Sequence, residues 1–341
     1  MAVNYVHPSG VNGDVTVEAN ELTKQFGSDY AVQGLTFNIP RGKIIGFIGP
    51  SGCGKTTTVR LMTGIYRPSA GYVNVFGRPP DQFSSQVRER VGYMPQLFVL
   101  YQDLSVWENM NFVASLYGMS LFRRGKRMRE LLQFVELDND RYKLARNVSG
   151  GMQRRLSLAA TLLHDPELIF LDEPTAGIDP ILRRKFWDQF QELKASGRTL
   201  FVTTQYVNEA AYCDYVGVMA EGRLLMLETP ENLRRRAFNG EVVDLVTEQP
   251  LNWNDINQLQ QLPFVQGRAI TSSGNSVRLI VDEASTAIPA IINWVNERQL
   301  QVKSVEEYLP PFDDVFVTIV EKARADIENG SAAVTQEVRN G

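Results

Sequence analysis

The sequence predicts an α/β fold with a largely parallel sheet, followed by a second, smaller α+β domain. Leu168–Leu171 and Thr199–Val202 are continuous apolar runs, which are typical of parallel strands buried on both faces. After Gly240 the pattern changes to β-α-β-β-α-β. The length of 341 residues exceeds that of a usual single domain and favours one large domain with a smaller module.

The first part of the large domain is expected to be rich in strands. Residues 1–14 carry Pro, Ser, Gly and Asn without periodicity, which predicts a flexible tail. Val15–Phe26 and Ala31–Ile39, separated by a Gly-Ser-Asp turn, are predicted to form two antiparallel strands, and Lys43–Ile48 a short buried one. We assign the large domain to residues 15–240.

A helical block is expected at about 97–150 inside this domain. Ser105 and Glu108 form a capping box, and the apolar residues after it recur at helical spacing. A basic run, Arg123–Arg129, lies within the block. Such a run is most often a solvated connection, and the alternative is contact with anionic headgroups or with a membrane protein.

The smaller domain is predicted over 241–326. Its expected elements are a strand at 241–247, a helix at 253–262, two strands around Gly274, a helix at 285–297 and a strand at 301–309. That order is the ferredoxin-like arrangement. Thr229-Pro230 predicts a short helix just before the boundary, and the polar segment 327–341 is expected to be a disordered tail.

Composition excludes several classes of protein. The formal net charge is -4, from 35 basic and 39 acidic residues, so charge does not suggest a nucleic-acid partner. Two cysteines, Cys53 and Cys213, do not make a disulfide framework and fit the reducing cell interior. We see no secretory signal and no run of the roughly 18 to 20 apolar residues that a membrane helix needs. A role at a membrane therefore requires a partner.

A phosphate-binding loop is predicted directly after the strand at Lys43–Ile48. The segment 49–56, Gly-Pro-Ser-Gly-Cys-Gly-Lys-Thr, matches the pattern of glycines followed by Lys-Thr at the start of a helix. Backbone N–H groups and the helix dipole favour phosphate there, Lys55 suits the β and γ phosphates, and the Thr56 hydroxyl suits magnesium. The alternative is an ordinary glycine-rich turn. The candidate nucleotide contacts are Gly49, Ser51, Gly52, Cys53, Gly54, Lys55, Thr56 and Thr57.

Two carboxylates follow the apolar run at Leu168–Leu171. Asp172 and Glu173 are delivered to the carboxyl end of a buried strand, where ligands bind in open α/β sheets. Asp172 suits the magnesium shell, and Glu173 suits a general base that polarises the attacking water. Taken alone, these residues are equally well explained as a strand followed by a turn.

The segment Asn147–Arg155 gives the pattern its specificity. Its Val-Ser-Gly-Gly-Met resembles the Leu-Ser-Gly-Gly-Gln signature of ABC (ATP-binding cassette) ATPases. Ser149, Gly150 and Gly151 open a helix, so a hydroxyl and free N–H groups can hold a γ-phosphate presented by an opposing subunit. A simple helix cap is the alternative. The resemblance covers about Val15 to Arg236.

The resemblance implies a P-loop ABC cassette with a RecA-like core, an antiparallel β subdomain and a helical subdomain. It implies ATP and Mg²⁺ as cofactors, with Thr56, Gln96 and Asp172 around the metal. Phe26 matches the aromatic residue that stacks on adenine, although it also fits a strand core. Asp179, in Ala-Gly-Ile-Asp-Pro, matches the loop that communicates across a dimer of cassettes.

Two positions depart from the family pattern. Gln205 stands where the family has a histidine that senses the γ-phosphate; it can donate a hydrogen bond but cannot become cationic, which predicts slower or less tightly coupled hydrolysis. Met152 replaces the last signature residue, as in exporter-type relatives of the drug, antibiotic and lipid branches. The C-terminal extension is also similar to that branch, where it can be a regulatory or dimer-stabilising module.

The resemblance implies an ATPase subunit that powers an exporter. Its expected partners are transmembrane permease chains and a second cassette, in a homodimer or a heterodimer, and its expected place is the cytoplasmic face of the membrane, bound through the permease. One alternative is a regulatory cassette that binds ATP with little hydrolysis. The other is a soluble ABC ATPase of ribosomes or DNA, but this chain has neither two cassettes nor a long coiled-coil insertion.

Overall fold

The protein divides into two compact units, Met1–Thr229 and Pro230–Gly341, here named the N-terminal and C-terminal units. The computed structural model describes residues 14–273 and 275–339, and only the backbone of 268–273 and 327–339. Of the flexible N-terminal tail predicted at 1–14, residues 1–13 therefore lie outside the described residues. The division falls before the helix Pro230–Phe238 and not near Gly240, because that helix packs against the last helix of the chain.

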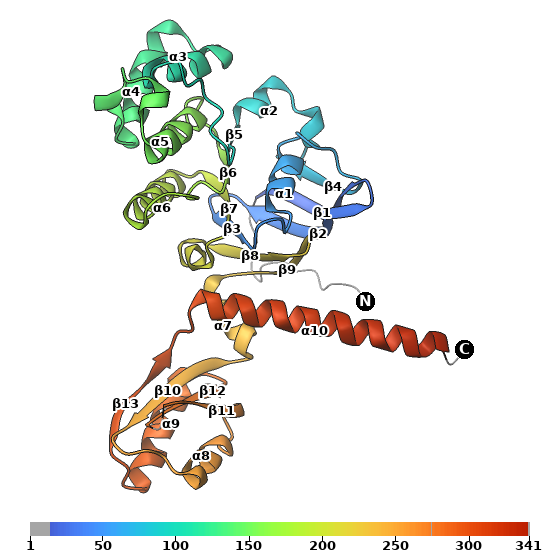
Figure 1. The fold of residues 1–341 in the computed structure, drawn as a ribbon, viewed down its shortest axis with the longest axis vertical. Helices are drawn as coiled ribbons and strands as arrows, with labels where there is room; N and C mark the ends of the chain where they lie inside the picture. Colours follow the sequence, from blue (N-terminus) through green and yellow to red (C-terminus); the bar gives the residue numbers. More distant parts are fainter. Residues whose placement is uncertain (1–13, 274, 340–341) are drawn as a thin grey trace. The chain divides into compact units, whose positions relative to one another are not determined.

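A six-stranded sheet forms the centre of the N-terminal unit (Figure 1). Its order is β5-β6-β7-β3-β8-β9, and every pair is parallel except β8 with β9. Strands β3, β6 and β7 are buried at every residue, which confirms the parallel strands expected from the apolar runs. The strands are β3 (Ile44–Ile48), β5 (Val91–Met94), β6 (Leu168–Asp172), β7 (Thr199–Thr204), β8 (Tyr215–Ala220) and β9 (Arg223–Glu228).

A three-stranded antiparallel sheet of order β2-β1-β4 packs beside the central sheet. It consists of β1 (Val15–Phe26), β2 (Asp29–Pro40) and β4 (Ala70–Val75). The Phe37 ring meets Phe47 edge-on at 5.2 Å between centroids, and Phe47 in turn lies 4.6 Å from Phe201. These aromatic contacts join the two sheets into one core.

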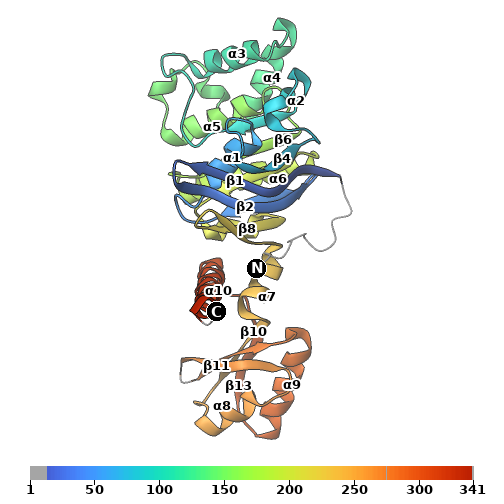
Figure 2. The ribbon, with the colours of Figure 1, turned by 90° about the vertical axis from the view of Figure 1, so that its right-hand side faces the viewer.

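The helices α3, α4 and α5 gather at one end of the N-terminal unit, away from β1 and β2, as both views show (Figures 1 and 2). The predicted capping box is present: Glu108 N–H donates to Ser105 Oγ (3.2 Å), and Ser105 N–H donates to Glu108 Oε2 (2.7 Å). The helices of the unit are α1 (Lys55–Met62), α2 (Ser85–Glu89), α3 (Val106–Leu116), α4 (Leu121–Phe134), α5 (Gly150–Thr161) and α6 (Pro180–Ala195), with short 3-10 turns η1 (Pro80–Gln82), η2 (Asp138–Asp140), η3 (Ala145–Asn147) and η4 (Val207–Tyr212).

The C-terminal unit has a four-stranded antiparallel sheet of order β11-β12-β10-β13. Helices α8 and α9 cover one face of it, with Leu259 and Ile291 packed into the core over Leu245 and Leu279. The six elements follow the expected β-α-β-β-α-β order, and the term ferredoxin-like remains our interpretation of it. The six elements are β10 (Glu241–Thr247), α8 (Trp253–Gln260), β11 (Val265–Ser273), β12 (Ser276–Val281), α9 (Ala284–Glu297) and β13 (Val302–Tyr308), and α7 (Pro230–Phe238) precedes them.

The last helix, α10 (Phe312–Arg339), differs from the expected disordered tail at 327–341. Phe312, Val315 and Ile319 recur at helical spacing and are buried, so packing establishes the first turns. Once these turns are fixed, each added residue gains a hydrogen bond at little further cost, and the helix continues through the polar segment. Over the described ranges, no helix has the length and apolar character needed to cross a bilayer.

Candidate nucleotide site

The loop at 49–56 connects β3 to α1, and its glycines are required by its surroundings. Gly54 has φ 103°, and a Cβ there would lie 2.4 Å from the Ala31 carbonyl oxygen. A Cβ on Gly49 would lie 2.3 Å from the Met219 carbonyl oxygen. Larger residues are therefore excluded at both positions. The loop curls at the start of α1, the geometry that presents backbone N–H groups to a phosphate.

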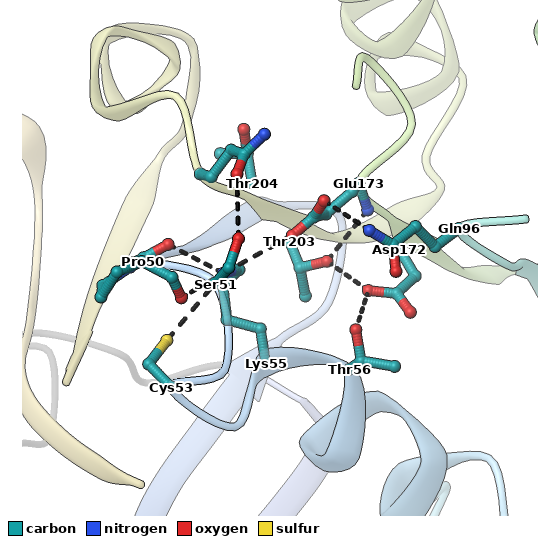
Figure 3. A network of polar contacts seen from close by, with 12 residues as sticks. Pro50, Ser51, Cys53, Lys55, Thr56, Gln96, Asp172, Glu173, Thr203 and Thr204 are labelled. Atoms are coloured by element: carbon teal, nitrogen blue, oxygen red, sulfur yellow. Dashed lines mark hydrogen bonds and ion pairs between the residues drawn. The ribbon is translucent and has the colours of Figure 1, made fainter. Parts of the chain in front are cut away.

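Lys55 is buried within this loop, with 4% of its surface exposed. Its Nζ donates hydrogen bonds to the carbonyl oxygens of Gly49 (2.8 Å) and Pro50 (3.0 Å) and lies 3.6 Å from Glu173 Oε1 (Figure 3). A buried ammonium group needs such partners because its desolvation is costly. The cation is thus held where the loop closes on itself, beside the carboxylate that follows β6.

Asp172 is the buried carboxylate at the end of β6. Its Oδ1 accepts hydrogen bonds from Thr56 Oγ1 (3.0 Å) and Thr203 Oγ1 (2.7 Å), while Oδ2 is buried without a partner among the described residues. Burial raises the pKa of Asp172, and the two hydroxyl donors act in the opposite direction. An orphaned carboxylate oxygen beside a threonine hydroxyl fits a hard cation such as Mg²⁺, which prefers oxygen ligands.

Glu173 has a left-handed backbone, with φ 48°. Its N–H donates to both the carbonyl and the hydroxyl oxygen of Thr203, each at 3.0 Å, and these bonds hold the unusual conformation. Gln96 Nε2 donates to Glu173 Oε2 at 2.8 Å. The fixed carboxylate at the edge of the loop is placed as a general base would be.

Thr203 donates to the Asp172 carboxylate and accepts from the Glu173 backbone N–H, and sequence reasoning did not single it out. Strand β7 pairs with β6 so that Thr203 stands opposite Asp172. One sequence signal was available: the apolar run Leu200–Val202 ends in Thr203 and Thr204. Polar residues at the carboxyl end of a buried strand lie at the sheet edge where ligands bind.

Gln205, at the position of the expected histidine, also reaches the loop. Its Oε1 accepts a hydrogen bond from Ser51 Oγ at 3.1 Å. The structure therefore brings Gln205 and Glu173 to the loop that carries Lys55, although both follow Lys55 by more than 100 residues. Lys55 and Glu173 border a cleft of about 210 Å³, the phosphate-loop cleft, which is lined by Ala31, Ser51, Gly52, Gly54, Lys55, Thr56, Thr57, Gln96 and Glu173.

Phe26 stands apart from the lining of this cleft. Its ring is 45% exposed and meets Tyr66 edge-on at 5.3 Å between centroids. The exposure disfavours the alternative of a strand core residue, while stacking on adenine remains a prediction. Lys24 Nζ lies 5.1 Å from the same ring.

Ser149 and Asp179 lie in a second cleft, of about 450 Å³. Each caps a helix: Ser149 Oγ accepts from Met152 N–H (3.3 Å) at the start of α5, and Asp179 Oδ1 accepts from Ile181 N–H (3.0 Å) at the start of α6. This Ser149 cleft is lined by Glu136, Ser149, Gly151, Met152, Arg155, Gly177, Ile178, Asp179, Ile181, Leu182 and Lys185. Those predicted nucleotide-binding residues that line a cleft thus divide between two separate clefts of one chain.

Cys53 is a buried thiol in the loop, with 3% of its surface exposed. Burial raises its pKa, and the nearby Lys55 only partly opposes that effect. The thiol form is therefore favoured at neutral pH, which supports the interpretation of Cys53 as a small loop residue over a redox sensor.

Comparison with known proteins identifies the family. Residues 32–176 match the ABC transporter family. The chain is 36% identical over 240 residues to the probable multidrug ABC transporter ATP-binding protein YbhF of Escherichia coli, covering 70% of this chain and 42% of that protein. It is 36% identical over 234 residues to the Nod factor export ATP-binding protein I of Cupriavidus pinatubonensis, which covers 68% of this chain and 72% of that protein. The protein belongs to the family of ABC transporter ATP-binding subunits.

Further comparisons extend this assignment. The daunorubicin resistance ATP-binding protein DrrA3 of Streptomyces coeruleorubidus is 31% identical over 305 residues, 89% of this chain and 95% of that protein, so the similarity reaches into the C-terminal unit. The chain also resembles solved cassettes. One of them is the cbiO1 protein of Clostridium perfringens, part of the ABC transporter complex cbiONQ. It superposes with a TM-score of 0.59 at 26% identity, covering 73% of this chain and 96% of that chain.

A second solved structure is a dimeric cassette in a post-hydrolysis state with ADP and Pi. It superposes with a TM-score of 0.58 at 26% identity, covering 62% of this chain and 98% of that one. The α/β cassette fold and the ABC family expected from the motifs are thereby confirmed. Binding of ATP or ADP is a property of the class.

Proposed function

We propose that the chain binds Mg-ATP, closes with a second cassette across the nucleotide, and hydrolyses it to drive export through separate permease chains. One observation supports the proposal: the residues predicted to bind nucleotide line two different clefts of the same chain. The phosphate-loop cleft supplies Lys55 and the Glu173 carboxylate, and the Ser149 cleft supplies two helix N-termini, which favour an anion. A second copy brings one cleft to face the other.

Residues in and beside the phosphate-loop cleft have different roles in the proposed hydrolysis. Lys55 exchanges its bonds to loop carbonyls for the β and γ phosphates, and Glu173 accepts a proton from the attacking water. Gln96 holds the Glu173 carboxylate, and Gln205 meets the γ-phosphate through its amide. Thr56, Asp172 and Gln96 would hold Mg²⁺, which neutralises charge on the phosphates.

Dimer closure can be tested with the whole chain. Glu173→Gln should trap the closed state, so sedimentation in millimolar Mg-ATP should give a dimer and in ADP a monomer. Ser149→Arg places a bulky cation at the start of α5, and it should abolish the dimer while the chain still binds ATP. The proposal fails if Glu173→Gln binds Mg-ATP and remains a monomer. It also fails if Ser149→Arg dimerises like the parent.

The permease and the membrane are proposed partners. Support comes from the exporter names of the relatives and from the surface of the helical block, where Leu121 is 71% and Phe122 is 97% exposed. Arg123 is exposed beside them, whereas Arg124 donates to Ser115 Oγ and Arg127 pairs with Asp165. We propose that this surface faces the inner side of the cell membrane. Replacing Phe122 with Ser and Arg123 with Gln should reduce recovery of the chain in the membrane fraction together with its permease. Unchanged recovery would contradict the assignment.

Gln205 favours a second candidate, a cassette that binds ATP and turns it over slowly. The neutral amide bonded to Ser51 cannot take up the charge that an imidazole carries. We predict that Gln205→His raises ATPase turnover in the assembled transporter several-fold, with little change in nucleotide affinity. An unchanged or lower rate would reject glutamine as the limiting residue.

A further inference from the structure

The segment after Gln205 lies along α6, the helix that begins at Asp179. Trp187 of α6 stacks on Tyr212 of η4, with ring centroids 5.1 Å apart and an interplanar angle of 19°. Gln191 Nε2 donates to the Tyr212 carbonyl oxygen at 2.8 Å. These contacts hold the far end of η4 firmly against the helix. They are ordinary packing and hydrogen bonding, and they carry no charge.

The near end of η4 is held differently, by a buried charge. Glu209 is 2% exposed, and both of its carboxylate oxygens lack a hydrogen-bond donor among the described residues. Arg183 of α6 is its ion-pair partner, with Nε 3.6 Å from Glu209 Oε1. The Arg183 guanidinium also lies 3.8 Å above the ring of Tyr206, the residue that follows Gln205. One arginine thus contacts two residues of the segment behind Gln205.

Arg183 is at the same time tied to the start of α6. Its N–H donates to the Asp179 carbonyl oxygen at 2.9 Å, in the first turn of the helix. Asp179 lines the Ser149 cleft, while Gln205 bonds to Ser51 of the phosphate loop. The Arg183–Glu209 pair therefore joins the first turn of α6, which begins next to Asp179, to the segment that follows Gln205.

We propose that Arg183 and Glu209 are positioning residues that hold Gln205 and Asp179 in one fixed arrangement, so that the two clefts of a cassette respond together to nucleotide. This inference rests on the proposed function. A buried ion pair is a poor source of stability, because desolvation offsets the attraction between the charges. In this proposal the pair fixes geometry, because any shift of Arg183 away from Glu209 would leave a buried carboxylate without its cation.

The test compares a broken pair with an apolar pair. Arg183→Met leaves the Glu209 carboxylate buried without its cation, so this single variant should be less stable than the parent. Arg183→Met combined with Glu209→Met removes both charges and should recover the thermal stability. If the pair positions the clefts, the double variant should still turn over ATP ~10-fold or more slowly, because small misplacements of catalytic groups have effects of that size. ATP affinity and KM should change little, since neither residue lines the phosphate-loop cleft.

Two further variants make the comparison specific. Lys194→Met removes another cation of α6, one that pairs with Asp214 at 3.2 Å and is about as exposed as Arg183, at 28% against 27%. It lies at the opposite end of the helix and should turn over like the parent. Arg183→Lys keeps the charge and should recover part of the lost rate.

The outcomes separate the two proposals. A stable double variant with parental turnover would overturn the positioning role and leave the proposed function intact. Equal losses in the double variant and in Lys194→Met would also overturn it, because any disturbance of α6 would then suffice. A parent chain that hydrolyses no ATP with a permease and second cassette would instead overturn the proposed function.

Discussion

The two units of the chain differ in what they bury. Over residues 14–229, the N-terminal unit buries five acidic or basic side chains, Lys55, Asp172, Glu173, Glu209 and Glu228. Among the described residues of the C-terminal unit, Thr247 is the sole buried polar side chain, and the rest of its core is apolar. Burying charge costs free energy, and a fold keeps such groups where geometry or chemistry requires them. The comparison therefore places the buried charges of the described structure in the N-terminal unit.

The largest effect should come from Glu173→Gln. The amide keeps the size of the side chain but cannot accept a proton from water, so turnover should fall by ~100-fold to 10,000-fold. Binding of ATP should persist, because the change leaves Lys55 and the glycine-rich loop in place. Turnover and equilibrium nucleotide binding measured on the same preparation check this. A loss of binding equal to the loss of rate would show that Glu173 is chiefly structural.

The next effect concerns the apolar core of the C-terminal unit. Leu245 is fully buried on β10, so Leu245→Ala should destabilise that unit by ~2–5 kcal/mol. Hydrogen exchange should accelerate across β10 to β13, while β3, β6 and β7 keep their protection and nucleotide affinity is unchanged. If exchange rises equally in both units, they do not act as separate cooperative parts and the comparison breaks down.

A smaller effect is expected at Thr203. Thr203→Val keeps the shape but removes the hydroxyl that serves both Asp172 and Glu173, which should cost ~1–3 kcal/mol in stability and also slow hydrolysis. Thr199→Val is the matched control: it lies on the same strand, is 1% exposed and accepts a bond from Gly42 N–H. It should lose stability without a specific loss of turnover. Denaturant unfolding and ATPase rates, measured for both variants, distinguish the two roles.

The smallest effect is a dependence on pH. His164 Nε2 donates to the Val91 carbonyl oxygen at 3.0 Å, and Nδ1 is buried without a partner in the described structure. Burial is the largest effect on the His164 pKa and lowers it, and the charge of Arg127 lowers it further. The hydrogen bond to Val91 and the charges of Asp165 and Glu89 raise the pKa, but by less. The unfolded chain then binds a proton more readily near pH ~6.5, so acidification below that value destabilises the fold.

This pH effect should be confined to the N-terminal unit. The chain has two histidines, His7 and His164, and neither lies in the C-terminal unit. Lowering the pH from about 7 to about 5.5 should therefore accelerate hydrogen exchange around β5 and α5, after correction for intrinsic rates, and leave β10 unchanged. His164→Gln should abolish the difference. A response of the same size in that variant would assign it to other groups.

The motifs and buried strands were predictable because each is written in consecutive residues. Apolar runs identified β3, β6 and β7, and the loop pattern identified Lys55 and Thr56. Thr203 was missed because its role depends on the register that places it opposite Asp172. The Arg183–Glu209 pair was missed because it depends on how η4 packs along α6. The extent of α10 was missed because packing in its first turns overrides the polar composition that follows.

The two sulfhydryl groups of the chain, at Cys53 and Cys213, have a practical consequence. Both are buried, and burial raises the pKa of each, so thiol-directed reagents should react with them slowly. A cysteine introduced at Ile181, where the native side chain is 76% exposed beside the Ser149 cleft, should take up a maleimide dye selectively. The distance between dyes on two labelled copies can then be followed by spectroscopy in real time as the copies close, on a chain that is otherwise native.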